Sequence, residues 1–85
     1  MDTLYIRAHI RLTTTQDAID FVSLLNSDGS TDKFILESEN REHCVDARSF
    51  LGVLYFISEH NDDTYLVNRT NNEIPNTIDR FRVIE

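Results

Sequence analysis

The chain has 85 residues, a formal net charge of −7 and an apolar content of 40%. A chain of this length forms one domain, residues 1–85, with a single modest core, and its low content of Gly and Pro argues against disorder or collagen-like repeats. The eight Lys and Arg residues are scattered along the sequence, so neither nucleic acid nor an anionic membrane is expected as a partner.

The sequence also indicates a compartment. No apolar run reaches the roughly 20 residues that a membrane span requires, and the chain opens on an alternating segment instead of the apolar core of a signal peptide. The single cysteine, Cys44, has no second cysteine in the chain with which to form a disulfide, which favours a reducing compartment. We therefore expect a cytoplasmic protein.

Residues 4 to 12 alternate strictly between apolar and polar side chains. Polar or amphipathic residues occupy one face, and the other face carries Leu4, Ile6, Ala8, Ile10 and Leu12. A period of two over nine residues predicts a strand with one buried and one solvated face. The sheet should therefore be covered by helices on one side only.

The following segment changes to a helical period. Thr14, with Asp17 three residues later, resembles a capping box, and Gly29 suits a left-handed residue after the helix. The apolar stripe consists of Ala18, Phe21, Val22 and Leu25, with Ile19 and Leu24 beside it.

The rest of the chain contains three more strands and two more helices. Residues 33–38 and 43–47 predict a hairpin with its turn at residues 39–41, and a helix follows from Asp46 or Ser49 to Ser58. After a loop at residues 60–63, residues 64–68 predict a fourth strand. Pro75 suits the first turn of a last helix, whose apolar side is Ile74, Ile78 and Phe81, with Val83 and Ile84 as its extension.

The predicted order is β-α-β-β-α-β-α. It indicates an α+β open-faced β-sandwich, in which one four-stranded sheet carries the helices on one face. Ferredoxin-like and ACT domains share this split βαβ order, so the order alone does not choose a family.

The central segment VDARSFLGVLYFIS resembles HPr, the histidine-containing phosphocarrier of the bacterial sugar phosphotransferase system. That family has a valine at the end of a strand, a short linker, a serine at the start of a helix and a glycine three residues later. The matching positions are Val45, Ser49 and Gly52. The resemblance is continuous over about fourteen residues, and the order of elements agrees along the whole chain.

The phosphocarrier half of the family pattern is missing. The family places its phosphorylated histidine at the start of the first helix, where the helix N-terminus favours an anion. The matching loop here contains Thr14, Thr15, Gln16 and Asp17, without the histidine, arginine or proline of the motif. Gln16 resembles the glutamine of the Crh-type paralogues. Histidine phosphotransfer through this loop is not expected.

The resemblance implies two functional features on the central helix. Phe50, Leu51 and Leu54 match the apolar positions on which partner proteins dock, and an exposed apolar patch usually marks an interface. Ser49 matches the serine phosphorylated by the bifunctional HPr kinase/phosphorylase, which switches partners. Two structural explanations stay open: the apolar residues are covered by the C-terminal helix or a second copy, and Ser49 is simply a helix cap.

No other group of residues carries a recognisable chemistry. His9, His43 and His60 lack the spacing of metal ligands, no glycine loop for phosphate exists, and Cys44 reads as a small buried side chain. No metal, cofactor or enzymatic activity is therefore expected.

We expect a non-catalytic, HPr-like regulatory domain that binds a protein such as an HPr kinase/phosphorylase or a transcriptional regulator. The alternatives are an ACT-type or ferredoxin-like ligand sensor acting as an oligomer through its sheet, and a phosphotransfer protein that uses His9 or His43.

Overall fold

The computed structural model describes residues 6–27, 29–60 and 62–84. The described residues contain both helices and strands, and the strands pair antiparallel, which confirms an α+β fold. The elements are β1 (Arg7–Ile10), α1 (Thr15–Asn26), β2 (Phe34–Glu37), β3 (Cys44–Asp46), α2 (Phe50–Glu59), β4 (Thr64–Asn68) and the 3-10 helix η1 (Asn76–Phe81).

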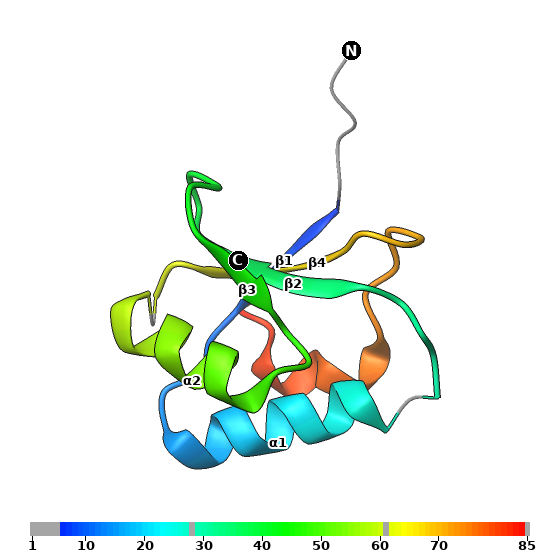
Figure 1. Cartoon of the computed structure of the whole chain (residues 1–85), viewed down its shortest axis with the longest axis horizontal. Helices are drawn as coiled ribbons and strands as arrows, with labels where there is room; N and C mark the ends of the chain where they lie inside the picture. Colours follow the sequence, from blue (N-terminus) through cyan, green and yellow to red (C-terminus); the bar gives the residue numbers. More distant parts are fainter. Residues whose placement is uncertain (1–5, 28, 61, 85) are drawn as a thin grey trace.

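The four strands form one antiparallel sheet in the order β1-β4-β2-β3. The helices lie together on one face of this sheet, with α1 and α2 side by side beneath it (Figure 1). Alternation along each strand points Ala8, Leu66 and Leu36 toward the helices, and all three are fully or almost fully buried. The predicted open-faced arrangement, with helices on one face of a single sheet, is therefore confirmed.

Helix α1 is specified by its cap and its stripe. The Thr14 side chain accepts a hydrogen bond from the backbone N–H of Asp17, as the sequence predicts. The four stripe residues are buried: Ala18, Phe21, Val22 and Leu25. Gly29, just beyond the helix, has φ +77°, the left-handed conformation that glycine adopts most easily. Of the two flanking residues, Leu24 packs partly on the core, whereas Ile19 is 40% exposed.

The first strand is shorter than its alternating pattern predicts. Leu4 and Tyr5 lie outside the described residues, and the prediction that Ile6 is buried is wrong, since it is 56% exposed. The backbone N–H of Ile6 donates to the Asn72 side chain instead of entering the ladder. Leu12 is buried, as predicted, but lies beyond the end of the strand. The ladder extends only over the four residues of β1 that pair with β4.

The hairpin between β2 and β3 turns at the predicted place. The N–H of Ser38 donates to the carbonyl of His43 at 3.0 Å, and the N–H of Arg41 donates to the carbonyl of Ser38 at 2.9 Å. Arg41, with φ 64°, takes the left-handed conformation of this turn.

The C-terminal segment differs most from its prediction. The last helix is a 3-10 helix that Pro75 precedes, and Ile78 and Phe81 are buried as predicted. The proposed extension by Val83 and Ile84 is wrong. The chain instead turns extended at Arg82, which pairs with Ile10, and the N–H of Val83 donates to the carbonyl of His9 at 2.8 Å. The free edge of β1 takes these hydrogen bonds in place of a further helical turn.

Candidate interaction site around helix α2

Helix α2 begins at the serine that the sequence singles out. Ser49 is the N-cap residue, with extended backbone, and its Oγ accepts a hydrogen bond from the N–H of Gly52 at 3.2 Å. This satisfies one of the N–H groups that every helix leaves without a partner at its start. A Cβ atom added at Gly52 would lie 3.4 Å from Oγ of Ser49, an ordinary van der Waals distance, so the hydroxyl does not require a glycine at this position. Ser49 is therefore a cap, as one of the two explanations predicts.

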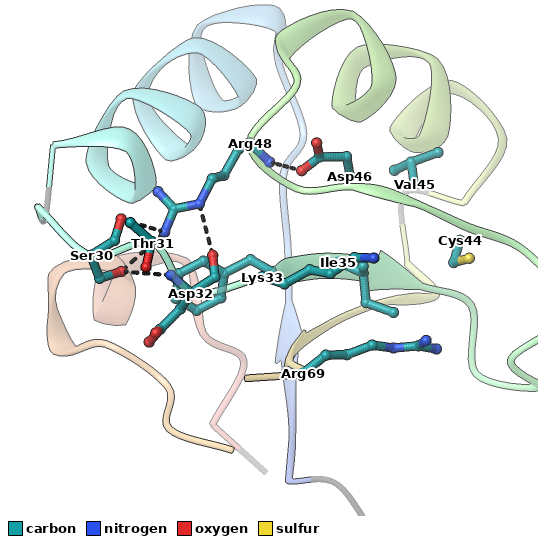
Figure 2. A pocket seen from close by; sticks show the side chains of 11 residues that line it. Ser30, Thr31, Asp32, Lys33, Ile35, Cys44, Val45, Asp46, Arg48 and Arg69 are labelled. Atoms are coloured by element: carbon teal, nitrogen blue, oxygen red, sulfur yellow. Dashed lines mark hydrogen bonds between the residues drawn. The ribbon is translucent and has the colours of Figure 1, made fainter. Parts of the chain in front are cut away.

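Arg48 fixes the position of this helix start. Its guanidinium donates to the carbonyl oxygens of Leu25, Ser30 and Asp32, and it lies over the ring of Phe34 with 4.9 Å from Cζ to the ring centroid. Figure 2 shows the side chain reaching from the start of α2 into the loop before β2. Because the carbonyl of Leu25 belongs to the last turn of α1, Arg48 joins the end of one helix to the start of the next.

The two apolar faces of α2 have different surroundings. Val53, Phe56 and Ile57 are buried against the core. On the opposite side, Leu51 is 75% exposed and Tyr55 is 68% exposed. These two residues are four apart and so lie next to each other on one helix face. The helix therefore carries an apolar strip that no described part of the chain covers.

The predicted docking residues divide into two groups. Leu51 is exposed as the docking prediction requires, but Phe50 and Leu54 are half-buried and pack on the edge of the core. Tyr55 was missed, although its spacing of four from Leu51 is a signal that the sequence contains. C-terminal η1 packs against α1, whereas α2 packs against α1 and β3.

The loop that matches the phosphocarrier site is a capping structure. Oδ2 of Asp17 accepts hydrogen bonds from the backbone N–H and the Oγ1 of Thr13, each at 3.0 Å. These bonds, the one from the backbone of Thr13 first among them, lower the pKa of Asp17. Gln16 donates to Asp20 at 2.9 Å, one turn along α1. Thr14 acts as the cap, and Thr15 is the first residue of the helix.

The fold brings three arginines to this loop that the sequence keeps apart. Arg11, Arg80 and Arg82 line a cavity of about 680 Å³ that also borders Thr13 and Asp17. Arg80 forms an ion pair with Asp20 at 2.8 Å. Arg11 follows the end of β1, whereas Arg80 lies in η1 and Arg82 just after it. Because these residues are far apart in the chain, the sequence alone does not indicate the cluster.

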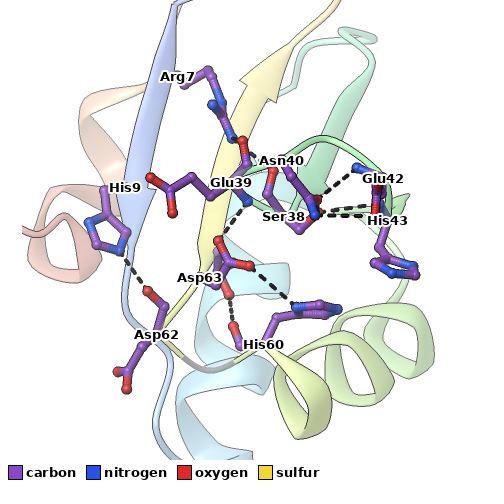
Figure 3. A network of polar contacts seen from close by, with 11 residues as sticks. Arg7, His9, Ser38, Glu39, Asn40, Glu42, His43, His60, Asp62 and Asp63 are labelled. Carbon is purple, nitrogen blue, oxygen red and sulfur yellow. Dashed lines mark hydrogen bonds and ion pairs between the residues drawn. The ribbon is translucent and has the colours of Figure 1, made fainter.

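The histidines occupy two places. His9 stacks on Tyr65 with 4.7 Å between ring centroids, and its Nε2 lies 3.1 Å from the carbonyl oxygen of Asp62. His60 caps the end of α2, between the rings of Phe56 at 4.8 Å and His43 at 5.2 Å. Figure 3 shows His43 and His60 together beside the polar turn between β2 and β3.

His60 also has an acidic neighbour. Its Nδ1 lies 3.5 Å from Oδ2 of Asp63. Within residues 6–27, 29–60 and 62–84, no three His, Cys, Asp or Glu residues are grouped as metal ligands would be.

Cys44 is exposed, so its interpretation as a small buried side chain is wrong. The reason is its place on the solvent face of the edge strand β3, opposite Glu37.

A buried carboxylate organises the solvent face of the sheet. The side chain of Glu37 is 8% exposed, and its Oε2 lies 3.0 Å from Nε of Arg7 and 3.4 Å from Nε of Arg41. Arg7 also donates to the carbonyls of Ser38 and Glu39. Its guanidinium lies 4.1 Å above the ring centroid of Tyr65 (Figure 3 includes part of this network). This network fixes the hairpin to β1 and β4.

Comparisons with protein-family models, with curated proteins and with solved structures give no match for this chain. No helix in the described ranges has the length and apolar character needed to cross a membrane.

Proposed function

We propose that this chain is a non-catalytic, HPr-like interaction domain that binds a protein partner through α2 and is switched by phosphorylation at Ser49. The observation that carries the proposal is the pair Leu51 and Tyr55. Both are large, both are more than two-thirds exposed, and both lie on one face of a helix that begins at the candidate serine. A contiguous exposed apolar strip of this kind is typical of an interaction surface.

The environment of Ser49 supports the switch. A phosphate on its Oγ would lie at the N-terminus of a ten-residue helix, where backbone N–H groups and the helix dipole favour negative charge. It would add up to two negative charges two residues from Leu51. A partner that docks on an apolar strip would be repelled or attracted by this charge according to its own surface.

Several parts of the proposal follow from the family resemblance. Partners would be an HPr kinase/phosphorylase or a transcriptional regulator in the bacterial cytoplasm. The threonine-rich loop at residues 13–17 would take no part in phosphotransfer, because Asp17 would oppose a phosphate in the first turn of α1 and no histidine replaces the one that is missing.

The test is intact-mass analysis after incubation with ATP and an HPr kinase/phosphorylase, with a phosphocarrier HPr as the positive control. The wild-type chain should gain one phosphate and Ser49→Ala none. Leu51→Lys should slow the reaction about tenfold, one decade of rate, if the kinase docks on the strip. Ile84→Lys alters another aliphatic residue, which is 96% exposed, and should react at the wild-type rate. No phosphate on the wild-type chain, with the control active, would refute the switch.

A further inference from the structure

The two edges of the sheet differ in whether another segment of the chain pairs with them. The edge of β1 is occupied by the chain itself, since Arg11 and Val83 donate backbone hydrogen bonds to Phe81 and His9 across it. The other edge, β3, has no such cover among the described residues. An uncovered edge strand presents backbone N–H and C=O groups that can pair with another chain.

The register identifies the backbone groups that are open. The carbonyl of His43 and the N–H of Ala47 both bond to the neighbouring strand β2, at 3.0 Å each, and Val45 lies opposite Leu36 between them. Because backbone groups alternate in direction along a strand, those of Cys44 and Asp46 point away from the sheet. The carbonyl of Asp46 accepts the N–H of Ser49 at 3.2 Å, which leaves the N–H and C=O of Cys44 and the N–H of Asp46.

A groove runs along this edge between β3 and α2. It has a volume of about 580 Å³. From the strand side it is lined by Glu42, His43, Cys44 and Val45, and from the helix side by Tyr55, Phe56, Glu59 and His60. An edge strand facing a helix across a groove is a geometry in which extended peptides add to a sheet.

The charge of the groove selects the occupant. Glu42 and Glu59 are exposed at its rim, and none of its lining residues is a lysine or arginine. Asp46 adds a third carboxylate on the exposed strand, and the whole chain carries a net charge of −7. His43 and His60 also line the groove, and Nδ1 of His60 lies 3.5 Å from Oδ2 of Asp63. A cationic segment is favoured by this field and an acidic one is opposed.

We propose that the groove between β3 and α2 binds an extended, basic segment of a partner protein by strand addition to β3. Opposite Cys44 the segment would place one residue on the solvent face of the sheet. The residues on either side would point down onto Val45, Tyr55 and Phe56. Alternating basic and apolar side chains therefore fit the groove. This site is separate from docking on Leu51, although Tyr55 borders both.

The test uses a synthetic peptide with capped ends and the sequence Lys-Val-Lys-Val-Lys, titrated into the full chain while amide NMR spectra are recorded. The amide protons of Cys44 and Asp46 should shift more than that of Val45, whose N–H bonds to β2. The matched peptide Glu-Val-Glu-Val-Glu should cause no such shift. Methylating the central backbone nitrogen should weaken binding about fivefold, because the bond to the carbonyl of Cys44 is lost.

Two charge variants separate the groove from general attraction. Glu42→Lys with Glu59→Lys should weaken binding of the basic peptide about tenfold, a decade in the dissociation constant. Glu73→Lys with Asp79→Lys makes the same change in net charge on exposed residues away from the groove, and should change binding much less. Leu51→Lys should leave the peptide affinity within a factor of about two, which distinguishes this site from the helix strip.

Three results would overturn the proposal. One is equal weakening by both charge variants, which would indicate attraction to an acidic surface. Another is the same affinity for the methylated peptide, which would exclude strand addition. The third is a concentration-dependent shift of Cys44 without peptide, which would assign the edge to a second copy of the chain.

Discussion

Replacing Ser49 by alanine tests the cap that begins α2. The substitution removes the oxygen that accepts the N–H of Gly52 at 3.2 Å and leaves that donor half-buried without its partner. Loss of a serine cap costs about 1 kcal/mol, within a range of about 0.5–2 kcal/mol. For a domain of this size that loss lowers the melting temperature by roughly 4–8 °C. It would also remove a substantial part of an unfolding free energy of about 4–13 kcal/mol.

The assay is urea denaturation followed by far-ultraviolet circular dichroism, with Ser49→Asp as the matched variant. Aspartate also caps helices and favours the positive end of the helix dipole, so Ser49→Asp should stay within about 0.5 kcal/mol of the wild type. The slope of the transition should be the same in all three proteins. A Ser49→Ala chain as stable as the wild type would refute the cap. Equal losses in both variants would show that another contact of the serine is responsible.

Three further predictions concern stability. The lowered pKa of Asp17 means that its hydrogen bonds stabilise the fold fully above the unfolded value near 3.8. This contribution is lost as the pH falls through the lower folded pKa, so acid titration of Asp17→Asn should show a smaller loss of stability in that range than the wild type. Glu37→Ala should destabilise by about 3 kcal/mol in chemical denaturation, because the partly buried Arg7 loses its carboxylate; an unchanged midpoint would contradict this. Gly29→Ala should destabilise by about 1 kcal/mol at its positive φ. Gly52→Ala, in the first turn of α2 with ordinary contacts, should stabilise by up to about 1 kcal/mol; thermal melts that gave both variants the same sign would refute the assignment.

Features fixed by neighbouring residues were predictable from the sequence. Thr14 and Ser49 were both identified as starts of helices, and each accepts the N–H of the residue three positions later. Such a bond depends on side chains within one turn, so the local sequence contains all the information it needs. The same applies to the left-handed Gly29 and to the buried stripe of α1.

Features that depend on distant segments were not predictable. The alternation of residues 4–12 is a correct signal for one strand, but it does not specify how many of those residues find a partner. That number depends on β4, more than fifty residues later. The apolar character of Val83 and Ile84 was equally compatible with a helix and with the extended segment that pairs on β1. Only the open edge of β1 decides between them.

The candidate site shows the same division. The sequence predicts that α2 is too apolar for an ordinary surface helix. In the structure this excess of apolar residues is seen as the exposed side chains of Leu51 and Tyr55. It does not predict which residues are exposed, because the direction of the buried face depends on α1 and β3. Phe50 and Leu54, which were predicted to be exposed docking residues, therefore pack on the core, and Tyr55 is exposed instead. The groove beside β3 could not be seen at all, since its two sides come from separate elements and its open edge depends on strand order.

Helix α2 thus borders two neighbouring surfaces that share Tyr55. Ser49 lies at one end of the helix, and Glu59 and His60 lie at the other end, where the groove meets the hairpin. Ten residues of α-helix separate them by about 15 Å, which exceeds the screening length of roughly 8–10 Å at physiological salt. A phosphate on Ser49 would therefore act strongly on a partner seated at Leu51, only two residues away. It would act only weakly on the part of a basic segment held by Glu59, and more strongly on the part at Asp46, whose carbonyl accepts the N–H of Ser49 at 3.2 Å.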